Sequence, residues 1–273
     1  MLRLLHLLLL PLLGLIAGLA LADTPSPAPG PLLGPALGVV LMHGKGGSPD
    51  KHVAGLANAL RQQGVLVANL DMPWSGRREY DADVASAEHQ VSEALASLRS
   101  QGARKLVLAG HSQGGLFALY LAGHLPVDGV IAIAPGGNVG AGLLHDQLAD
   151  TLAKARELLA AGHGEEKTRL ADFEGSKGRY PVTTTPRIYL DWFDPEGTMN
   201  QGKAVRQLPA GLPVLYISPE GDYPALQRVR QSMFDALPTN PASQLLIPPG
   251  SHLQAPAAAI PGIVDWLSRV AHD

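Results

Sequence analysis

Lys105-Leu-Val-Leu-Ala-Gly-His-Ser-Gln-Gly-Gly-Leu-Phe-Ala118 is the stretch that decides how this chain folds. An apolar, strand-like run leads directly into Gly110-His-Ser112-Gln-Gly114, and a helix-like run follows. We expect Ser112 to occupy a sharp turn, because a side chain at either flanking glycine would collide with neighbouring backbone. Such a turn exposes the hydroxyl beside the free N–H groups of a helix N-terminus. The pattern therefore marks Ser112 as a candidate nucleophile.

Short apolar runs alternate with helical patterns on both sides of this turn, from about residue 36 onward. Strands are predicted over residues 37–42, 65–70, 106–109, 130–134, 213–218 and 244–247. One helix is predicted to begin at Ser48-Pro49-Asp50, which read as N-cap, N1 and acidic first turn. A second is predicted directly after Ser112, and further helices over 84–98, 144–159, 224–237 and 257–270. The alternation predicts an α/β fold, with a mostly parallel central sheet and helices on both faces.

The alternation is interrupted between about residues 138 and 186. Apolar residues recur there at helical spacing, and a polar stretch then runs from Gly162 to about Pro186; the apolar residues are Leu144, Leu148, Leu152, Ala155 and Leu159. One interpretation is a small helical lid over the carboxyl ends of the strands. The other is an ordinary packed helix followed by a long surface loop. Both fit the pattern equally well.

The N-terminal segment differs from the rest of the chain. Arg3, an apolar run over 4–21 and Ala20-Leu21-Ala22 before Asp23 predict a signal peptide over 1–22. An uncleaved anchor is the alternative, because 4–22 is long enough to span a bilayer. Residues 23–35 form a proline-rich linker, and 36–273 the folded domain. Export would place the protein in the periplasm or outside the cell, with no stable membrane insertion after cleavage.

Composition excludes several classes of function. The 273 residues carry a net charge of −3, so no basic field invites nucleic acid. The chain has no cysteine, which removes disulfides, thiolate metal sites and cysteine nucleophiles. His145 and His163 are too far apart, with no carboxylate pattern between them, to suggest a metal site. We therefore predict neither a metal nor a cofactor.

Two loops near the C-terminus supply a candidate base and acid. His252, in Ile247-Pro-Pro-Gly-Ser-His252, follows the last predicted strand, and Asp222 follows the strand before it. A serine hydroxyl needs a base to take its proton, and a carboxylate normally orients that base. The carboxyl ends of parallel strands are where open α/β sheets place their sites. Glu220, in the same loop as Asp222, remains an alternative acid.

A glycine-rich loop after the first strand, Met42-His43-Gly44-Lys45-Gly46-Gly47, is suited to stabilise an oxyanion. The backbone N–H of Gln113 is one predicted donor, and the N–H of Lys45 or Gly46 is the second. The Lys45 side chain would either point inward and favour anionic substrates or point to solvent. Three aromatic residues are candidates for an acyl pocket, with core or rim packing as the alternative: Trp74, Tyr80 and Trp192.

The chain resembles the α/β-hydrolase superfamily over about residues 36–271. Ser112, Asp222 and His252 stand in the family's order of nucleophile, acid and base, and His43-Gly44-Lys45 matches its His-Gly-x oxyanion loop. Pro219 departs from the common Gly-x-x-Asp acid loop, and Lys45 from the usual aromatic or apolar residue. The resemblance implies an esterase-like or lipase-like serine hydrolase.

Such an enzyme would cleave a carboxylic ester or thioester, of small-molecule or lipid-like character, through an acyl-enzyme. An amidase or peptidase with the same triad, or a non-catalytic binding module of the same fold, are the alternatives. Because the superfamily hosts many reactions, the resemblance implies mechanism more than substrate.

Overall fold

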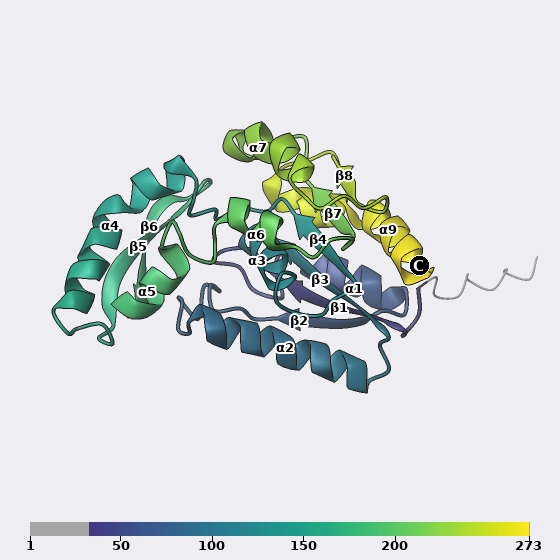
Figure 1. Cartoon of the computed structure of the whole chain (residues 1–273), viewed down its shortest axis with the longest axis horizontal. Helices are drawn as coiled ribbons and strands as arrows, with labels where there is room; N and C mark the ends of the chain where they lie inside the picture. The colour runs from purple at the N-terminus through teal and green to yellow at the C-terminus, as the bar shows by residue number, and fades with distance from the viewer. Residues whose placement is uncertain (1–32, 273) are drawn as a thin grey trace, which may run out of the picture. The chain divides into compact units, whose positions relative to one another are not determined.

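The computed structural model describes residues 33–272, so the predicted signal peptide and most of the predicted linker lie outside the described residues. Six parallel strands form the central sheet of this part of the chain, in the order β2-β1-β3-β4-β7-β8 (Figure 1). The strands are β1 (Leu37–Met42), β2 (Leu66–Leu70), β3 (Lys105–His111), β4 (Gly129–Ile133), β7 (Val214–Ile217) and β8 (Gln244–Leu246). The predicted parallel sheet is confirmed.

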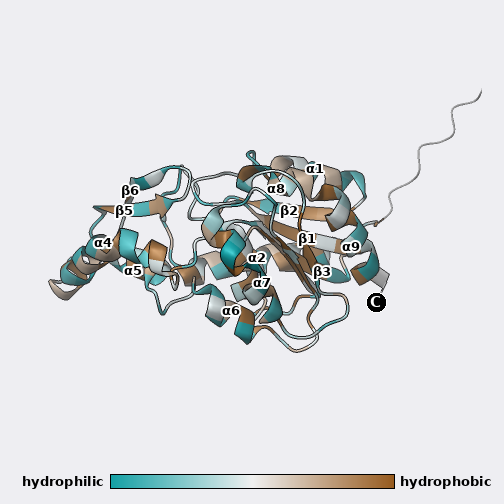
Figure 2. Ribbon diagram, turned by 90° about the horizontal axis from the view of Figure 1, so that it is seen from above, coloured by the Kyte–Doolittle hydropathy of each residue, from teal (hydrophilic) through white to brown (hydrophobic). Residues whose placement is uncertain are grey.

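Helices cover both faces of this sheet, as predicted. One face carries α1 (Ala54–Gln62), α8 (Ala255–Ala258) and α9 (Ile260–His272), and the other carries α2 (Val84–Ser100), α3 (Gln113–Leu121) and α6 (Gln201–Gln207). The remaining helix near the C-terminus, α7 (Pro224–Asp235), contacts α6. Figure 2 shows the hydrophobic strands β1 and β3 between helices that carry hydrophilic residues. Strands covered on both faces require continuous apolar runs, which β1 and β4 have.

The strand order reverses between β1 and β3. The chain moves from β1 to β2 on one side and later returns to β3 on the other, and the helices that follow β1 and β3 lie on opposite faces of the sheet. Met42 pairs with Gly110 in the register, which places the glycine-rich loop beside Ser112. Ligands in open α/β sheets bind at such a switch point, outside the carboxyl ends of the strands. The topology thus positions the candidate site.

The first helix begins later than predicted. Ser48-Pro49-Asp50 lies in consecutive turns, and α1 starts at Ala54 with Val53, not Ser48, at the N-cap position. The N–H of Lys51 donates to the carbonyl of Ser48, and His52 has a positive φ of 28° that no helix accepts. The proposed capping role of Ser48 is therefore wrong, because turn geometry prevails over the capping signal.

The insertion between β4 and β7 holds more structure than the sequence indicates. It contains α4 (Gly142–Ala160), β5 (Thr168–Glu174), β6 (Gly178–Thr184) and α5 (Pro186–Phe193), which together we call the cap. The predicted polar stretch up to Pro186 is in fact an antiparallel β-hairpin, with Leu170 paired to Val182. α4 contacts both β5 and α5.

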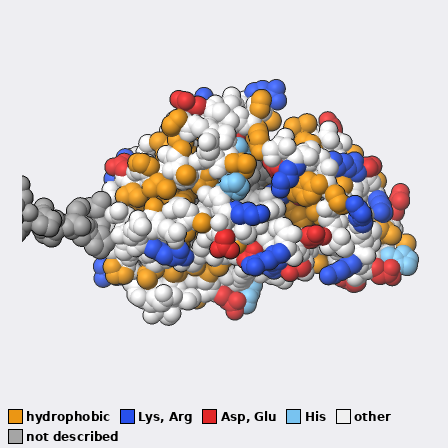
Figure 3. All heavy atoms as spheres, turned by 180° about the vertical axis from the view of Figure 1, so that it is seen from behind, with side chains coloured by type: hydrophobic (Ala, Val, Ile, Leu, Met, Phe, Trp, Pro, Cys, Tyr) orange, Lys and Arg blue, Asp and Glu red, His pale blue; other side chains and the backbone are white. Residues whose placement is uncertain are grey.

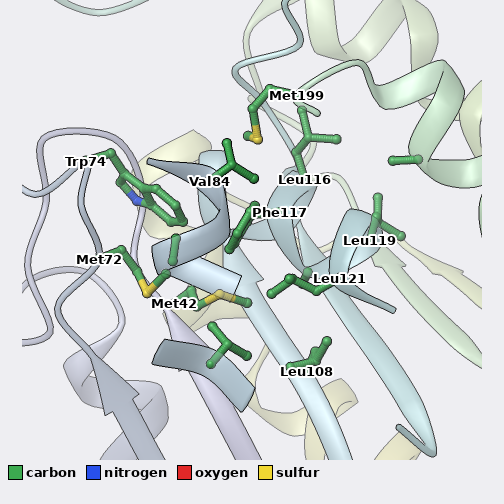
Figure 4. Close-up of a cluster of buried hydrophobic side chains, with 14 of the residues drawn as sticks. Met42, Met72, Trp74, Val84, Leu108, Leu116, Phe117, Leu119, Leu121 and Met199 are labelled. Atoms are coloured by element: carbon green, nitrogen blue, oxygen red, sulfur yellow. The ribbon is translucent and has the colours of Figure 1, made fainter. Parts of the chain in front are cut away.

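Aromatic side chains join the cap to the main core. Trp192 and Phe193 of α5 lie in the same buried cluster as Trp74 and Phe117. Figure 4 shows Trp74 near Phe117, and their ring centroids are 5.3 Å apart in an edge-on arrangement. Because these contacts are buried and specific, the cap packs as part of the domain core.

Within residues 33–272, no helix combines the length and apolar character needed to cross a bilayer.

Candidate active site

Ser112 lies in a strained turn between β3 and α3. Its φ of 54° and ψ of −117° are costly for any residue with a side chain. A Cβ at Gly110 would lie 2.1 Å from the carbonyl oxygen of Gly114, and one at Gly114 would lie 2.6 Å from that of Met42. The prediction that neither flanking position admits a side chain is confirmed. The N–H of Ser112 donates to the carbonyl of Ile133 at 2.8 Å, which ties the turn to β4.

The structure brings the three residues predicted as a triad into one hydrogen-bonded chain. His252 Nε2 lies 3.0 Å from Ser112 Oγ, and His252 Nδ1 lies 2.7 Å from Asp222 Oδ1. Because a carboxylate only accepts, the shared proton is assigned to Nδ1, which leaves Nε2 free to accept the serine proton. His252 and Asp222 are 3% and 4% exposed, so water does not compete for these contacts.

Main-chain hydrogen bonds hold the acid and base loops side by side. The N–H of Glu220 donates to the carbonyl of Pro248, and that of Gly221 donates to Gly250, each at 2.9 Å. The side chain of Glu220, the alternative acid, is exposed, whereas Asp222 is buried against His252. The geometry therefore favours Asp222 over Glu220 as the carboxylate that orients the imidazole.

Tyr223 packs against His252, a contact that the sequence analysis did not find. The two rings are stacked with centroids 4.3 Å apart and planes inclined by 22°. The Tyr223 hydroxyl donates to Glu174 Oε1 of the cap at 2.7 Å. Tyr223 directly follows Asp222 in sequence, which is a signal for its proximity to the site but not for its stacking. The cap therefore contacts the ring of His252 through one intervening side chain.

Two other histidines shape the loops around the site. His111 Nε2 donates to the carbonyl of His252 at 2.9 Å, and burial, followed by the proximity of His252, lowers the pKa of His111 to about 3. His43 Nε2 accepts from the N–H of Met72, and burial lowers the pKa of His43 as well. Both imidazoles are therefore neutral at physiological pH.

The predicted oxyanion donors lie in suitable loops. Lys45 follows β1, and Gln113 is the first residue of α3, directly after Ser112. The N–H of Gly46 already donates to the carbonyl of Trp74 at 2.8 Å. By contrast, no acceptor within residues 33–272 receives the N–H of Lys45 or Gln113. Lys45 is thus better placed than Gly46 as the second donor.

The Lys45 side chain follows neither of the two orientations considered from the sequence. Its Nζ lies 2.6 Å from Asp172 Oδ1 and 3.2 Å from the carbonyl of Phe173, both in β5. The Lys45 and Asp172 side chains are 5% and 0% exposed, so the pair is buried. Tyr80 and Tyr180 each donate to Asp172 Oδ2 at 2.9 Å. A buried carboxylate requires such partners, and it holds the ammonium in an ion pair, away from solvent.

The tryptophans suggested for an acyl pocket lie in the core. Trp74 and Trp192 are each 1% exposed, with ring centroids 5.4 Å apart. Their indole N–H groups donate to the carbonyls of His43 and Ala82. Neither ring lines the cavities beside Ser112. Both tryptophans therefore pack in the core, as the alternative prediction stated. Trp74 holds the loop after β1 in place through its hydrogen bond to the His43 carbonyl.

Two cavities of different character meet at Ser112. The larger, of about 230 Å³, is the more polar of the two and is lined by the oxyanion loop and by Ser48, Lys51, His52, Glu174, Ser176 and Lys177. The smaller, of about 140 Å³, is mainly apolar and includes Ala141, Leu143, Leu144, Phe173, Tyr223 and Leu226. Figure 3 shows basic side chains and a histidine at the rim of a hollow in one face of the molecule. A substrate carbonyl at Ser112 would thus have unlike surroundings on its two sides.

Within residues 33–272, no three histidine, aspartate or glutamate side chains come close enough together to hold a metal ion.

Comparison with solved structures shows the same fold in several enzymes. A structure reported for LipS and LipT, two metagenome-derived lipolytic enzymes, aligns with a TM-score of 0.60 and 17% identity, over 87% of this chain and 95% of that one. A monoacylglycerol lipase from Paleococcus ferrophilus has a TM-score of 0.60 and 20% identity, over 85% and 94%. Est1E from Butyrivibrio proteoclasticus, solved with ferulic acid, has a TM-score of 0.55 and 16% identity, over 85% and 86%.

Comparison at the level of sequence identifies the family. No curated protein matches the chain significantly. Residues 39–262, however, match the sequence model of the alpha/beta hydrolase family. The matched range contains Ser112, Asp222 and His252 and nearly all of the central sheet. The chain belongs to the alpha/beta hydrolase family.

Proposed function

We propose that this protein is a serine hydrolase that cleaves a carboxylic ester or thioester. The observation that carries the proposal is the buried chain from Asp222 through His252 to Ser112, whose hydroxyl lies where two cavities meet. A serine becomes nucleophilic when an oriented base takes its proton, and this arrangement supplies that base.

The proposed hydrolysis proceeds in two half-reactions, acylation of Ser112 and then hydrolysis of the acyl-enzyme. Ser112 Oγ attacks the substrate carbonyl while His252 Nε2 takes its proton, and the N–H groups of Gln113 and Lys45 stabilise the oxyanion. Protonated His252 then gives the proton to the leaving alcohol or thiol, and the acyl group remains on Ser112. A water molecule repeats the attack, with His252 again as base, and releases the carboxylic acid.

The cavities favour small substrates. Both volumes lie below the roughly 300–1,000 Å³ of typical ligand pockets. A short acyl chain is therefore a better fit than a long one. The lipolytic and esterase activities named for the structural neighbours support an ester rather than an amide substrate.

We also propose that residues 1–22 direct export to the periplasm or beyond the cell. The support is the charged start, apolar run and Ala20-Leu21-Ala22 of the sequence.

Hydrolysis of 4-nitrophenyl acetate, butyrate and octanoate tests the proposed activity. We expect turnover with a preference for the shorter esters, and Ser112→Ala should lower kcat/KM by about 10⁴-fold or more. Ser100→Ala is the matched control, because Ser100 lies at the exposed end of α2 and binds only the Ser97 carbonyl. Retention of more than a tenth of the activity in Ser112→Ala, with Ser100→Ala equal to wild type, would rule out Ser112 as nucleophile.

A further inference from the structure

The larger cavity beside Ser112 carries positive charge that the proposed reaction does not use. Lys51, from the turns before α1, and Lys177, from the tip of the cap hairpin, both line it. Neither lysine forms an ion pair with any carboxylate in residues 33–272. A Cβ at Gly46 would lie 3.2 Å from Lys177 Nζ, so this ammonium lies directly over the oxyanion loop.

The opposing negative charge in this cavity is limited and already engaged. Glu174 Oε1 accepts from the Tyr223 hydroxyl and the Ser176 N–H, and Oε2 accepts from the Ser176 hydroxyl. Burial raises the pKa of Glu174, but these hydrogen bonds and the charge of Lys177 outweigh burial and hold that pKa below its usual value. The charge of Lys45 is balanced by Asp172. Two lysines without a carboxylate partner therefore face one carboxylate in this cavity.

The smaller cavity beside Ser112 is more apolar than the larger one, although both share Glu174 and Lys45. Its walls include Leu143, Leu144, Phe173 and Leu226, and its one lysine is the paired Lys45. Apolar walls favour an aliphatic or aromatic group and disfavour an unpaired charge. A substrate bound across Ser112 therefore meets a cationic cavity on one side and an apolar one on the other.

We propose that the substrate is an ester with one apolar arm and one anionic arm, the latter bearing a carboxylate or phosphate held by Lys51 and Lys177. This inference rests on the proposed ester hydrolysis and narrows its substrate class. The anion would gain charge-assisted contacts with the two ammonium groups. Ser48 lines the same cavity, and a serine hydroxyl can donate a hydrogen bond to an anion.

Two matched pairs of esters test both orientations of the substrate. In the first pair the alcohol arm differs: the butyryl ester of 4-hydroxybenzoate against that of methyl 4-hydroxybenzoate. In the second the acyl arm differs: 4-nitrophenyl hydrogen adipate against 4-nitrophenyl methyl adipate. The wild-type enzyme should have the higher kcat/KM on the anionic member of at least one pair. Added salt should weaken that preference, because the lysines are exposed.

Removal of the lysine charges should remove the preference. Lys51→Met and Lys177→Met should each lower the anionic-to-neutral ratio of kcat/KM about threefold, and the double variant about tenfold. Lys167→Met is the control, because Lys167 is exposed and lines neither cavity, yet its loss changes the net charge equally. This variant should keep the wild-type ratio.

The experiment distinguishes failure of the anionic-arm inference from failure of the proposed ester hydrolysis. Ser112-dependent turnover of the neutral esters, with an unchanged ratio in the double lysine variant, would overturn the anionic-arm inference alone. A wild-type preference for the neutral member of both pairs would do the same. Failure of the wild-type protein to cleave any of the four esters would overturn the proposed ester hydrolysis together with this inference.

Discussion

Asp222 and Glu220 lie two residues apart in one loop, but only Asp222 contacts His252, at 2.7 Å. We predict that Asp222→Asn lowers kcat by about 10³- to 10⁴-fold, because an amide no longer fixes the tautomer with Nδ1 protonated. Glu220→Gln should remain within about twofold of wild type, because its exposed side chain is replaced by one of equal size. Steady-state kinetics on 4-nitrophenyl butyrate measures both, and a larger loss in Glu220→Gln would contradict the assignment of the acid.

His111 makes the stability of the fold depend on pH. Its pKa is about 3 in the folded protein and near 6.5, the ordinary histidine value, in the unfolded chain. Between these values the unfolded chain binds one more proton, so the free energy of unfolding falls as pH decreases. From pH 7 to pH 5 this amounts to about 2 kcal/mol, and His43 acts in the same direction.

His111→Gln tests this contribution, because glutamine retains an N–H donor for the carbonyl of His252 but does not titrate. Urea unfolding at pH 7 and pH 5 should show that wild type loses about 2 kcal/mol more stability than the variant. Equal losses in the two proteins would mean that His111 is not held neutral.

At the residue scale, local patterns identified Ser112, Asp222 and His252, which the structure brings together, but not the surroundings of other candidate residues. Ser112 was found from the glycines on either side of it, and Asp222 and His252 were found because each lies in a loop directly after a predicted strand. Trp74, Trp192 and the Lys45 side chain are different, because their contacts lie far away along the chain. Trp74 of one loop packs against Trp192 of α5, and Lys45 pairs with Asp172 of β5. No local signal specifies such contacts.

At the scale of elements, the cap hairpin is fixed to the oxyanion loop by the buried Lys45–Asp172 pair. Removal of one partner leaves the other charge buried without its counter-charge, which costs about 3–5 kcal/mol. We predict that Asp172→Asn and Lys45→Met each destabilise the protein by an amount in this range. The double variant should be less destabilised than the sum of the two.

Urea unfolding of the four proteins gives the coupling energy, which we expect to exceed about 1 kcal/mol. Arg179 and Asp150 form an exposed pair between β6 and α4 and serve as the matched control. Their coupling should stay below about 1 kcal/mol. Additive effects of Lys45→Met and Asp172→Asn would show that the buried pair does not join cap and loop.

The same hairpin explains why the insertion was only partly predicted. α4 has a regular apolar repeat, and the sequence identified it. On β5 and β6 the buried positions include Asp172 and Thr184 beside Leu170 and Val182, so the alternation of apolar residues is weak. A strand whose buried face carries a carboxylate resembles a polar loop in sequence.

At the scale of the whole molecule, the fold was predictable because each strand–helix unit repeats the same alternation. The order of the strands was not stated from the sequence, yet it places the loops after β1 and β3 next to each other. The meeting of the oxyanion loop, Ser112 and the acid and base loops is thus a property of the complete sheet.

Export is a prediction for the full-length chain, and it concerns residues outside the described part. The mature protein should begin at Asp23, because Ala20-Leu21-Ala22 provides the cleavage signal. Intact-mass analysis of the protein recovered from a secreting host measures this start. Retention of residues 1–22 would instead favour a membrane anchor.

The most direct test of the serine mechanism is covalent labelling with a fluorophosphonate, followed by peptide mass spectrometry to locate the adduct. The hydrogen bond from Ser112 Oγ to His252 Nε2 predicts one adduct per chain, on Ser112. Labelling should be lost in Ser112→Ala and strongly slowed in Asp222→Asn. An unlabelled wild-type protein, or an adduct that persists on another serine such as Ser251 when Ser112 is replaced, would contradict the account.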